Sequence, residues 1–250
     1  MKRIWIQGAG EMASGVAVVL TRAGHGVVLA ERSRPLAVRR LVAFSEAVTT
    51  GHARVEEVTG RLRSLPTEDP APGTVDVVVD PGGRLIRLWG PEAVVDARLT
   101  KNKPVPMPLG GAPLIGLGPG FTCGLDAALV VETHRPAGPG RVITEGSAAP
   151  DTGRPGNVGG QTVARVVRAP RAGRLQPRVA IGDLVEEGQV LGTVGGEDVV
   201  ANLAGRVRGL VHHHTELSKG EKVGDVDPRG EAVDPAAQCR EILLRDASVV

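Results

Sequence analysis

Two glycines near the start of the chain have the spacing of a turn that binds phosphate. Gly8 and Gly10 follow an apolar-rich run at residues 3–7 and lead into a stretch of helical period at residues 12–22. Gly8 permits a tight turn, Gly10 removes a Cβ atom where a phosphate would approach, and Ala13 suits close packing of helix on strand. Because the N–H groups and the dipole of a helix start favour an anion, we expect a nucleotide-binding turn. The residues that would contact the ligand are Gly8, Gly10, Glu11, Met12 and Ala13.

An acidic residue follows the second strand-like run, at the position that a dinucleotide-binding unit requires. Residues 27–30 are apolar, and Glu31 comes directly after them. An acid at this distance from the glycine turn accepts hydrogen bonds from ribose hydroxyl groups. The order of strand, glycine turn, helix, strand and acid predicts a Rossmann-like α/β domain. Many such folds keep these glycines for packing alone, so nucleotide binding and a structural role both stay open.

Two adjacent arginines lie on the next predicted helix, at residues 35–48. Pro35 suits the first position of a helix, and the apolar residues of this stretch recur near one helical face. Arg39 and Arg40 diverge from that face, where at least one of them would meet a phosphate or a carboxylate. The alternative is that both are solvated surface charges.

Further candidate ligand residues follow two later strands. Asp96 and Arg98 come just after an apolar run at residues 93–95. Polar residues in this place lie at the carboxyl edge of a parallel sheet, where open α/β folds bind ligands. A later glycine loop would expose backbone N–H groups as a second anion site, but a tight connection between two strands explains it equally well. The glycines of this loop are Gly116, Gly118 and Gly120.

The clearest internal signal is a repeat in the last third of the chain, whose two copies are separated by a constant offset. The offset is 32 residues, as from Ala169 to Ala201. Further matched pairs are Gly173 and Gly205, Arg174 and Arg206, Gly188 and Gly220, and Val194 and Val226. Two copies are too few for a solenoid, so we expect a symmetric pair of β units that close on each other. Alternating short strands and turns predict an all-β module with two-fold pseudosymmetry.

This repeat is similar in sequence to the barrel-sandwich hybrid fold of biotinyl and lipoyl carriers, most clearly at residues 169–175 and 181–194. Carriers place the modified lysine on the exposed hairpin that joins the two halves. The corresponding hairpin here, residues 194–200, contains no lysine. We therefore expect a carrier fold without the carrier function, and an unmodified protein.

These signals divide the chain into four parts. We expect a Rossmann-like nucleotide-binding domain at residues 1–132 and a connection rich in Gly and Pro at residues 133–166. The barrel-sandwich domain would follow at residues 167–230, and a C-terminal tail element at residues 231–250. The predicted fold class is thus an α/β domain followed by an all-β domain.

Composition and residue spacing exclude several other functions. Aromatic residues make up only 2% of the chain and the net charge is +2, which argues against a nucleic-acid surface. The run His212–His214 is not expected to bind a metal, because consecutive histidines diverge on a regular backbone and no acidic or Cys partner has ligand spacing. Without a long apolar run or an expected signal peptide, we predict a cytoplasmic protein with no membrane contact.

With both halves in place, the chain resembles the YqeB-type family, which is linked to the maturation of selenium-dependent molybdenum hydroxylases. The phrases that carry the resemblance are the first glycine turn and residues 35–40, 44–48, 95–98, 116–122, 146–147, 150–153 and 224–230. Cys123 stands where a small inert residue is expected, and its role is open. The resemblance implies an accessory role and brings no catalytic residue with it.

Three functions of different classes fit these observations. The first is a maturation factor that binds a nucleotide-containing ligand, such as a molybdopterin dinucleotide, and has a molybdenum hydroxylase as its partner. The second is an NAD-dependent oxidoreductase with an NAD-like cofactor, although no residue is a convincing partner for hydride transfer. The third is a non-catalytic docking protein whose barrel binds a partner. Whether the chain catalyses a reaction stays open, and we expect a homo-oligomer.

Overall fold

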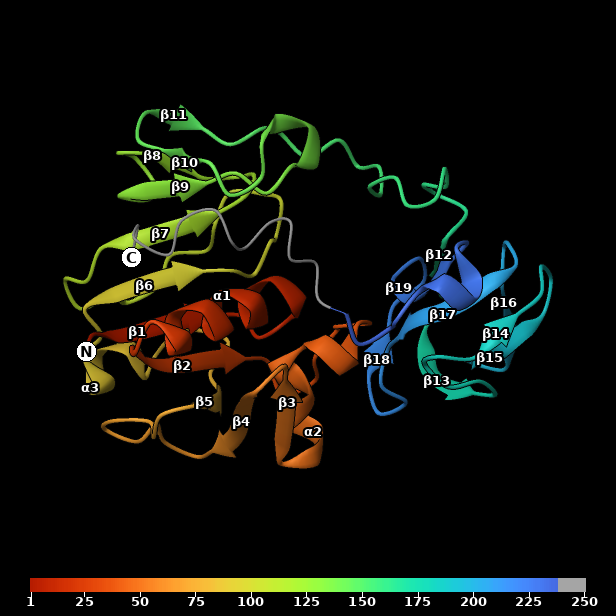
Figure 1. The fold of residues 1–250 in the computed structure, drawn as a ribbon, viewed down its shortest axis with the longest axis horizontal. Coiled ribbons are helices and arrows are strands. Elements are labelled where there is room, and N and C mark those ends of the chain that lie inside the picture. The colour runs from red at the N-terminus through yellow and green to blue at the C-terminus, as the bar shows by residue number, and fades with distance from the viewer. Residues whose placement is uncertain (238–250) are drawn as a thin grey trace. The chain divides into compact units, whose positions relative to one another are not determined.

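The computed structural model describes residues 1–237 and divides them into two compact units (Figure 1). The first unit contains Met1–Ser33 and Ala43–Thr152, and the second contains Arg34–Val42 and Gly153–Ala237. Most of the expected tail element at residues 231–250 lies outside the described residues. No helix within the described part of the chain is both long and apolar enough to cross a membrane.

The first unit is built on a mixed sheet of nine strands. The strands are β1 (Arg3–Gln7), β2 (Gly26–Glu31), β3 (His52–Val55), β4 (Val58–Arg63), β5 (Thr74–Val79), β6 (Ala93–Asp96), β7 (Leu114–Leu117), β9 (Leu129–Val131) and β10 (Val142–Ile143). Their order across the sheet is β10-β9-β7-β6-β1-β2-β5-β4-β3. All neighbours from β9 to β4 pair in parallel, and only the edge strands β10 and β3 are antiparallel to their neighbours.

Both faces of this sheet are buried, as the alternation of side chains along its central strands requires. On β1, Ile4 and Ile6 join the core on the face that also holds Ala13 and Ala17 of helix α1 (Glu11–Arg22). Trp5 points to the other face and packs in a second cluster with Trp89. The result is an α/β unit whose parallel strands end together at one edge.

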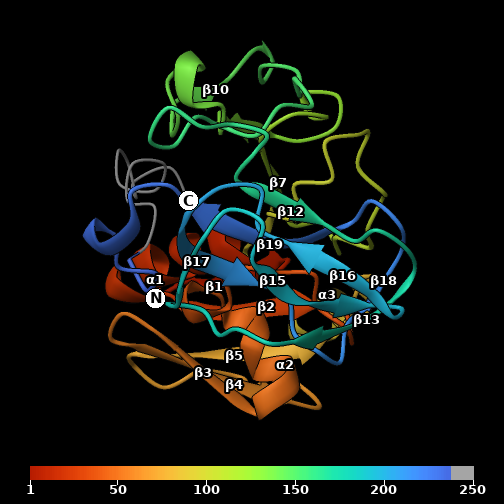
Figure 2. The ribbon, with the colours of Figure 1, turned by 90° about the vertical axis from the view of Figure 1, so that its right-hand side faces the viewer.

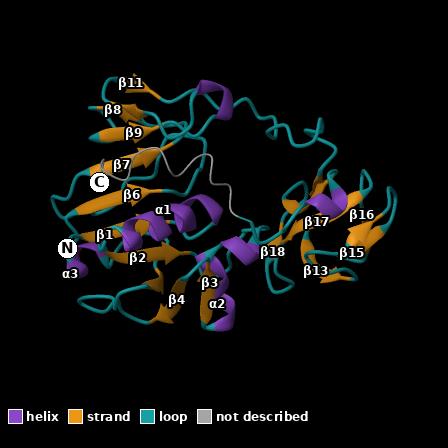
Figure 3. Ribbon diagram, in the orientation of Figure 1, coloured by secondary structure: helices purple, strands orange, loops and turns teal. Residues whose placement is uncertain are grey.

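Few other helices are present among the described residues, as Figure 3 shows in purple. They are α2 (Ala47–Thr50), α3 (Ile86–Trp89) and the 3-10 helices η1 (Arg40–Val42), η2 (Phe44–Glu46), η3 (Arg135–Ala137) and η4 (Gly230–Ala232). The helix predicted over residues 35–48 is therefore wrong. Residues 35–39 have no regular structure. They belong to the second unit and form backbone hydrogen bonds within it instead of along a helix, since the Leu210 N–H donates to the Val38 carbonyl at 2.8 Å.

Short antiparallel strands make up the second unit (Figure 2). They are β12 (Val166–Arg168), β13 (Gly173–Pro177), β14 (Leu184–Val185), β15 (Val190–Val194), β16 (Glu197–Val200), β17 (Gly205–Leu210), β18 (Glu216–Leu217) and β19 (Lys222–Asp227). They form two four-stranded sheets, with the orders β12-β19-β17-β14 and β16-β15-β13-β18.

The two-fold pseudosymmetry predicted from the repeat is confirmed by the strand pairing. The offset of the repeat, from Gly173 to Gly205, converts β12, β13, β14 and β15 into β16, β17, β18 and β19, and so converts one sheet into the other. The register follows: Leu184 pairs with Arg206, and the equivalent residues Glu216 and Arg174 pair in the same way. Each sheet therefore contains strands from both copies of the repeat.

The hairpin between β15 and β16 is the one where a carrier domain would hold its lysine. Val194 pairs with Glu197, and the two turn residues are Gly195 and Gly196, both with positive φ. Such a two-residue turn strongly favours glycine. No lysine lies on this hairpin, and the absence of a modification stays a prediction.

Candidate functional site at the carboxyl edge of the first sheet

The two glycines of the first turn differ in what surrounds them. Gly8 has a φ of +104°, and a Cβ atom there would lie 3.1 Å from the backbone carbonyl group of Ala97. Its N–H donates to the Ala30 carbonyl at 2.7 Å. Gly10 is the N-cap residue just before helix α1 and has an ordinary φ of −69°, and a Cβ atom there would have nothing within 4 Å. Gly8 is thus required by the fold, whereas the space beside Gly10 is open to a ligand.

Glu31 lies beside this turn and is held by backbone donors. Its carboxylate accepts hydrogen bonds from the Ala9 N–H at 3.0 Å and the Arg32 N–H at 2.8 Å. Burial raises the pKa of the Glu31 carboxyl, and these two hydrogen bonds oppose the rise. A carboxylate has about four lone-pair positions, so each oxygen can still accept a ribose hydroxyl.

A segment outside the predicted site residues also contacts the turn. The Ser45 N–H donates to the Ala9 carbonyl at 2.8 Å, and the Phe44 N–H donates to Ser14 Oγ at 2.8 Å. Ser45 is 1% exposed, and its Oγ has no hydrogen-bond partner among the described residues. A buried hydroxyl without a partner costs free energy unless a ligand or water satisfies it. In the sequence, only the family phrase at residues 44–48 indicated this residue.

Asp96 and Arg98 form a closed ion pair just past β6. The Arg98 guanidinium donates to both carboxylate oxygens of Asp96, from Nε at 2.9 and 3.1 Å and from Nη2 at 2.5 Å, and Nη2 also donates to the Val105 carbonyl at 2.9 Å. This segment lies against the first turn, because the nearest atoms to a Cβ at Gly8 belong to Ala97 and Arg98. The pair therefore supports the wall of the turn.

The second glycine loop is filled by protein atoms. A Cβ atom at Gly116, which lies within β7, would clash with the Phe121 ring. Cβ atoms at Gly118 and Gly120 would clash with Thr133 Oγ1 and with the Asn102 carbonyl oxygen. The Gly118 N–H is also occupied, since it donates to the Val131 carbonyl at 2.8 Å. These contacts explain the glycines as a tight connection between strands, and the second anion site stays a prediction.

Arg39 and Arg40 belong to the second unit and make their contacts there. Arg39 Nη2 donates to the Ala237 carbonyl at 2.7 Å, and Arg40 Nε donates to the Leu210 carbonyl at 2.7 Å. Arg39 is only 5% exposed. The structure thus gives both arginines partners in the second unit, and the binding of a phosphate or carboxylate by either one stays a prediction.

Other polar groups gather where β9 ends. Glu132 is fully buried and accepts hydrogen bonds from the backbone N–H groups of Thr133, His134 and Ala149, at 2.7 to 2.8 Å. It thereby ties Ala149 to the sheet edge. Close by in the chain, the short strands β8 (Thr122–Cys123) and β11 (Gly146–Ser147) pair with each other. Cys123 is partly exposed and donates to the Ala128 carbonyl.

A pocket of about 680 Å³ opens near the ends of β4 and β5. It is lined by Ser64, Val79, Asp80, Pro81, Gly82, Arg84 and Leu85. One Asp80 carboxylate oxygen already accepts the Leu85 N–H at 2.7 Å. None of the residues predicted from the sequence lines this pocket, so it does not coincide with the glycine turn.

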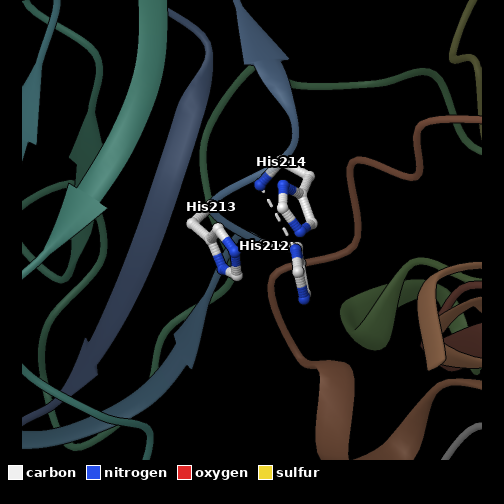
Figure 4. Close-up of side chains that lie close together, drawn as sticks. All are labelled: His212, His213 and His214. Carbon is white, nitrogen blue, oxygen red and sulfur yellow. Dashed lines mark hydrogen bonds between the residues drawn. The ribbon is translucent and has the colours of Figure 1, made fainter.

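The three consecutive histidines of the second unit do not diverge. One ring nitrogen from each histidine lies within 4.8 Å of those of the other two, and Figure 4 shows the rings gathered together. The premise that they point apart is wrong because residues 212–215 form a turn, closed by the Thr215 N–H on the His212 carbonyl at 2.9 Å. Burial, assisted by the nearby charges of Arg40 and the other two histidines, lowers the pKa of His212 to about 4.

The known proteins that are similar to this chain include one relative of high similarity and distant solved structures. No family model matches the chain. One solved structure with low similarity is a succinylglutamate desuccinylase/aspartoacylase from Rhodobacter sphaeroides, with 22% sequence identity and a TM-score of 0.23, where the match covers 26% of this chain and 22% of that one. Another is an aspartoacylase family protein from Mesorhizobium loti, with 16% sequence identity and a TM-score of 0.30, where the match covers 90% of this chain and 84% of that one. TM-scores this low carry no weight for fold or function.

The relative is the uncharacterized protein YqeB of Escherichia coli strain K12. It is 44% identical over 237 residues, which cover 92% of this chain but only 43% of the relative. The chain thus spans less than half of the length of the protein that it matches. At this identity over most of its own length, the chain is a homologue of YqeB.

Proposed function

We propose that the chain is an accessory protein of molybdenum hydroxylases and binds a nucleotide-containing ligand, such as a molybdopterin dinucleotide, at the Gly8–Gly10 turn. In this proposal the first unit is a Rossmann-like domain and the second a barrel-sandwich hybrid. The role in hydroxylase maturation and the hydroxylase as partner rest on the family resemblance. Nucleotide binding rests on the geometry of the turn.

The observation that carries the proposal is the open space beside Gly10. Helix α1 follows this glycine directly and has no side-chain cap, and the first N–H groups of a helix have no partner inside it. An anion placed there would meet those N–H groups and the positive end of the helix dipole. The Ser45 hydroxyl is buried without a partner among the described residues, and the Ser45 N–H donates to the Ala9 carbonyl of the turn, so this hydroxyl is a further polar group near the proposed site.

The position of the turn in the sheet supports the same proposal. From β1 the chain continues to β2 on one side, whereas β6 and β7 extend the sheet on the other side. Open parallel sheets bind ligands at the carboxyl ends of the strands where the order reverses in this way. Gly8 and Gly10 follow β1 directly, and Glu31 and Asp96 end its two neighbours.

A thermal-shift panel of NAD, NADP, CTP, ATP and molybdopterin dinucleotide tests whether such a ligand exists. A ligand at 100 times its Kd stabilises the folded state by about 2.7 kcal/mol, which is an easily measured shift. We expect the largest shift with the pterin dinucleotide. If none of the five compounds shifts the unfolding of the wild type, the proposed nucleotide site is wrong.

The decisive variant is Gly10→Val. Its branched side chain would fill the open space beside the helix start, so we expect it to abolish binding of the best ligand while the protein stays folded. Glu31→Ala should weaken a ribose-bearing ligand by roughly 1.5–3 kcal/mol, the usual effect of losing a hydrogen bond to a charged acceptor. Calorimetric titration of the ligand against each variant measures both effects.

Gly82→Val is the matched control for Gly10→Val. Gly82 also has an ordinary φ, and a Cβ there would meet only the Arg84 side chain at 3.9 Å. This control should bind the ligand like the wild type. Equal affinity in the wild type and in Gly10→Val would make the glycine a structural residue and remove the main support for the proposal.

A further inference from the structure

The turn at residues 212–215 of the second unit brings three imidazole rings together. The ring centroids are 3.9 to 5.0 Å apart, and the ligand nitrogens of His212, His213 and His214 lie within 4.8 Å of one another (Figure 4). His213 and His214 are exposed, and His212 is partly buried. The two exposed side chains can therefore rotate while the third is held by its surroundings.

The turn itself does not need histidine, as the other copy of the repeat demonstrates. The constant offset of the repeat places Ala180, Ile181 and Gly182 at the positions of the three histidines. The equivalent turn closes with the same bond, from the Asp183 N–H to the Ala180 carbonyl at 3.3 Å, as Thr215 N–H does to His212 at 2.9 Å. A turn with the equivalent closing bond thus forms without any imidazole, although Gly182 has a φ of +106° and the equivalent His214 has no positive φ. Closure of the turn therefore does not explain the three rings.

We propose that His212, His213 and His214 bind a divalent transition-metal ion of borderline softness, with Zn²⁺ as the representative ion. Imidazole nitrogen suits Zn²⁺, Co²⁺, Ni²⁺ and Cu²⁺, whereas Mg²⁺ and Ca²⁺ require oxygen ligands. Three ligands around tetrahedral zinc lie roughly 3.3 Å apart, given a Zn–N distance of about 2.0–2.1 Å. The ligand nitrogens now lie within 4.8 Å of one another, so metal binding requires the two exposed rings to rotate and bring them closer.

The proposed site has three protein ligands and therefore a fourth position for water or another ligand. Among the described residues no carboxylate or thiol joins the group. The Arg40 guanidinium donates to the Leu210 carbonyl at 2.7 Å, and its positive charge acts on His212. That charge opposes the binding of a cation, so Arg40→Gln should strengthen metal binding several-fold.

The experiment uses the full chain, purified without a polyhistidine tag, and titrates it with Zn²⁺ by calorimetry and with Co²⁺ by visible absorption. We expect one Zn²⁺ per chain and the intense d–d bands of tetrahedral Co²⁺. His213→Ala should weaken Zn²⁺ binding by at least about tenfold, the range found when support around a metal is removed. Replacing all three histidines by Ala, Ile and Gly, the residues of the equivalent turn, should abolish it.

His52→Ala is the matched control, because His52 is an exposed histidine on β3 of the first unit. It should bind both metals like the wild type. Equal Zn²⁺ affinity in the wild type and His213→Ala, or the weak bands of octahedral Co²⁺, would overturn the proposal and leave ordinary surface histidines. Should the triple replacement fail to fold, the single variants at the exposed His213 and His214 still decide. The nucleotide titrations are unaffected, so failure of one proposal does not imply failure of the other.

Discussion

Glu31 in the first unit and Asp225 in the second are both largely buried carboxylates, but different partners hold them. Glu31 accepts hydrogen bonds from two backbone N–H groups, and burial raises its pKa. Asp225 accepts two bonds from Arg165 Nη1, at 2.7 and 2.6 Å, and one from Lys222 Nζ at 2.8 Å. Burial alone would raise the pKa of Asp225, but the two cations outweigh it and lower that pKa.

The difference between these two acids shows what each unit does with a buried negative charge. Backbone donors carry no net charge, so they orient Glu31 at the glycine turn without neutralising it. Cations neutralise Asp225, and the ion pair joins Arg165, just before β12, to β19. The first arrangement keeps a charged acceptor beside a candidate ligand site, and the second connects two elements of a β structure.

The ion pair of Asp96 and Arg98 shows that local sequence produces the same geometry in both units. Asp227 and Arg229 in the second unit have the same spacing, and Arg229 donates to Asp227 from its N–H at 3.1 Å and from Nε and Nη2 at 2.9 and 2.8 Å. The motif Asp-x-Arg therefore braces the chain after a strand in either environment. It does not by itself indicate a ligand site.

The largest effect should come from removing the cation that neutralises Asp225. Arg165→Met keeps the apolar stem but leaves a buried carboxylate with Lys222 as its remaining side-chain cation among the described residues. Breaking a buried ion pair by removing one partner costs about 3–5 kcal/mol, and Lys222 should hold the loss near the lower value. Urea unfolding at neutral pH measures it. A loss below about 1 kcal/mol would mean that the pair behaves like an exposed one.

The second effect is a pH dependence of stability that comes from Asp225. Because its folded pKa lies below the ordinary 3.8, its contribution is present above that value and is lost as the pH falls through the folded pKa. Asp225→Asn should therefore be less stable than the wild type at pH 7, and the difference should shrink at pH 3. Urea titrations at the two pH values measure this change. A difference that does not depend on pH would contradict the charge pairing.

The smallest effect, on the order of 1 kcal/mol, should come from Glu31 and have the opposite sign. Since its folded pKa is raised above 4.5, the folded protein binds the proton more tightly, and stability falls as the pH rises through that window. Glu31→Gln has no such charge. Its stability deficit relative to the wild type should be greatest near pH 4.5 and diminish towards pH 8. If the free energy of unfolding of the two proteins changes with pH in the same way, burial does not disfavour the charged form of Glu31.

Much of the fold was predictable because it depends on local order along the chain. The succession of apolar run, glycine turn, helix and apolar run at residues 3–30 predicted the first crossover, and β1, α1 and β2 form it. The internal repeat predicted a symmetric β module. Strand pairing shows the same offset except after a bulge in β17, where Gly209 rather than Arg208 pairs with Asp225. Periodic patterns of this kind require the same local structure wherever they recur.

The tertiary structure decided which residues share an environment. A helical pattern predicted residues 35–48 as part of the first unit, yet Val38 is buried in the core of the second, where its carbonyl accepts the Leu210 N–H. Local propensity is worth only tenths of a kilocalorie per residue, so burial and a long-range hydrogen bond outweigh it. This is why the position of Arg39 and Arg40 could not be predicted from spacing.

The sequence by itself determined the presence of the glycine turn, the acid after the second strand, the repeat and the hairpin without a lysine. Only the tertiary structure decided that Gly8 is packed and Gly10 is open, that the second glycine loop is filled by Phe121 and Asn102, and that three histidines converge on one turn. The reason is physical. A residue type and its spacing limit the local backbone, whereas the space beside a residue depends on atoms from distant parts of the chain.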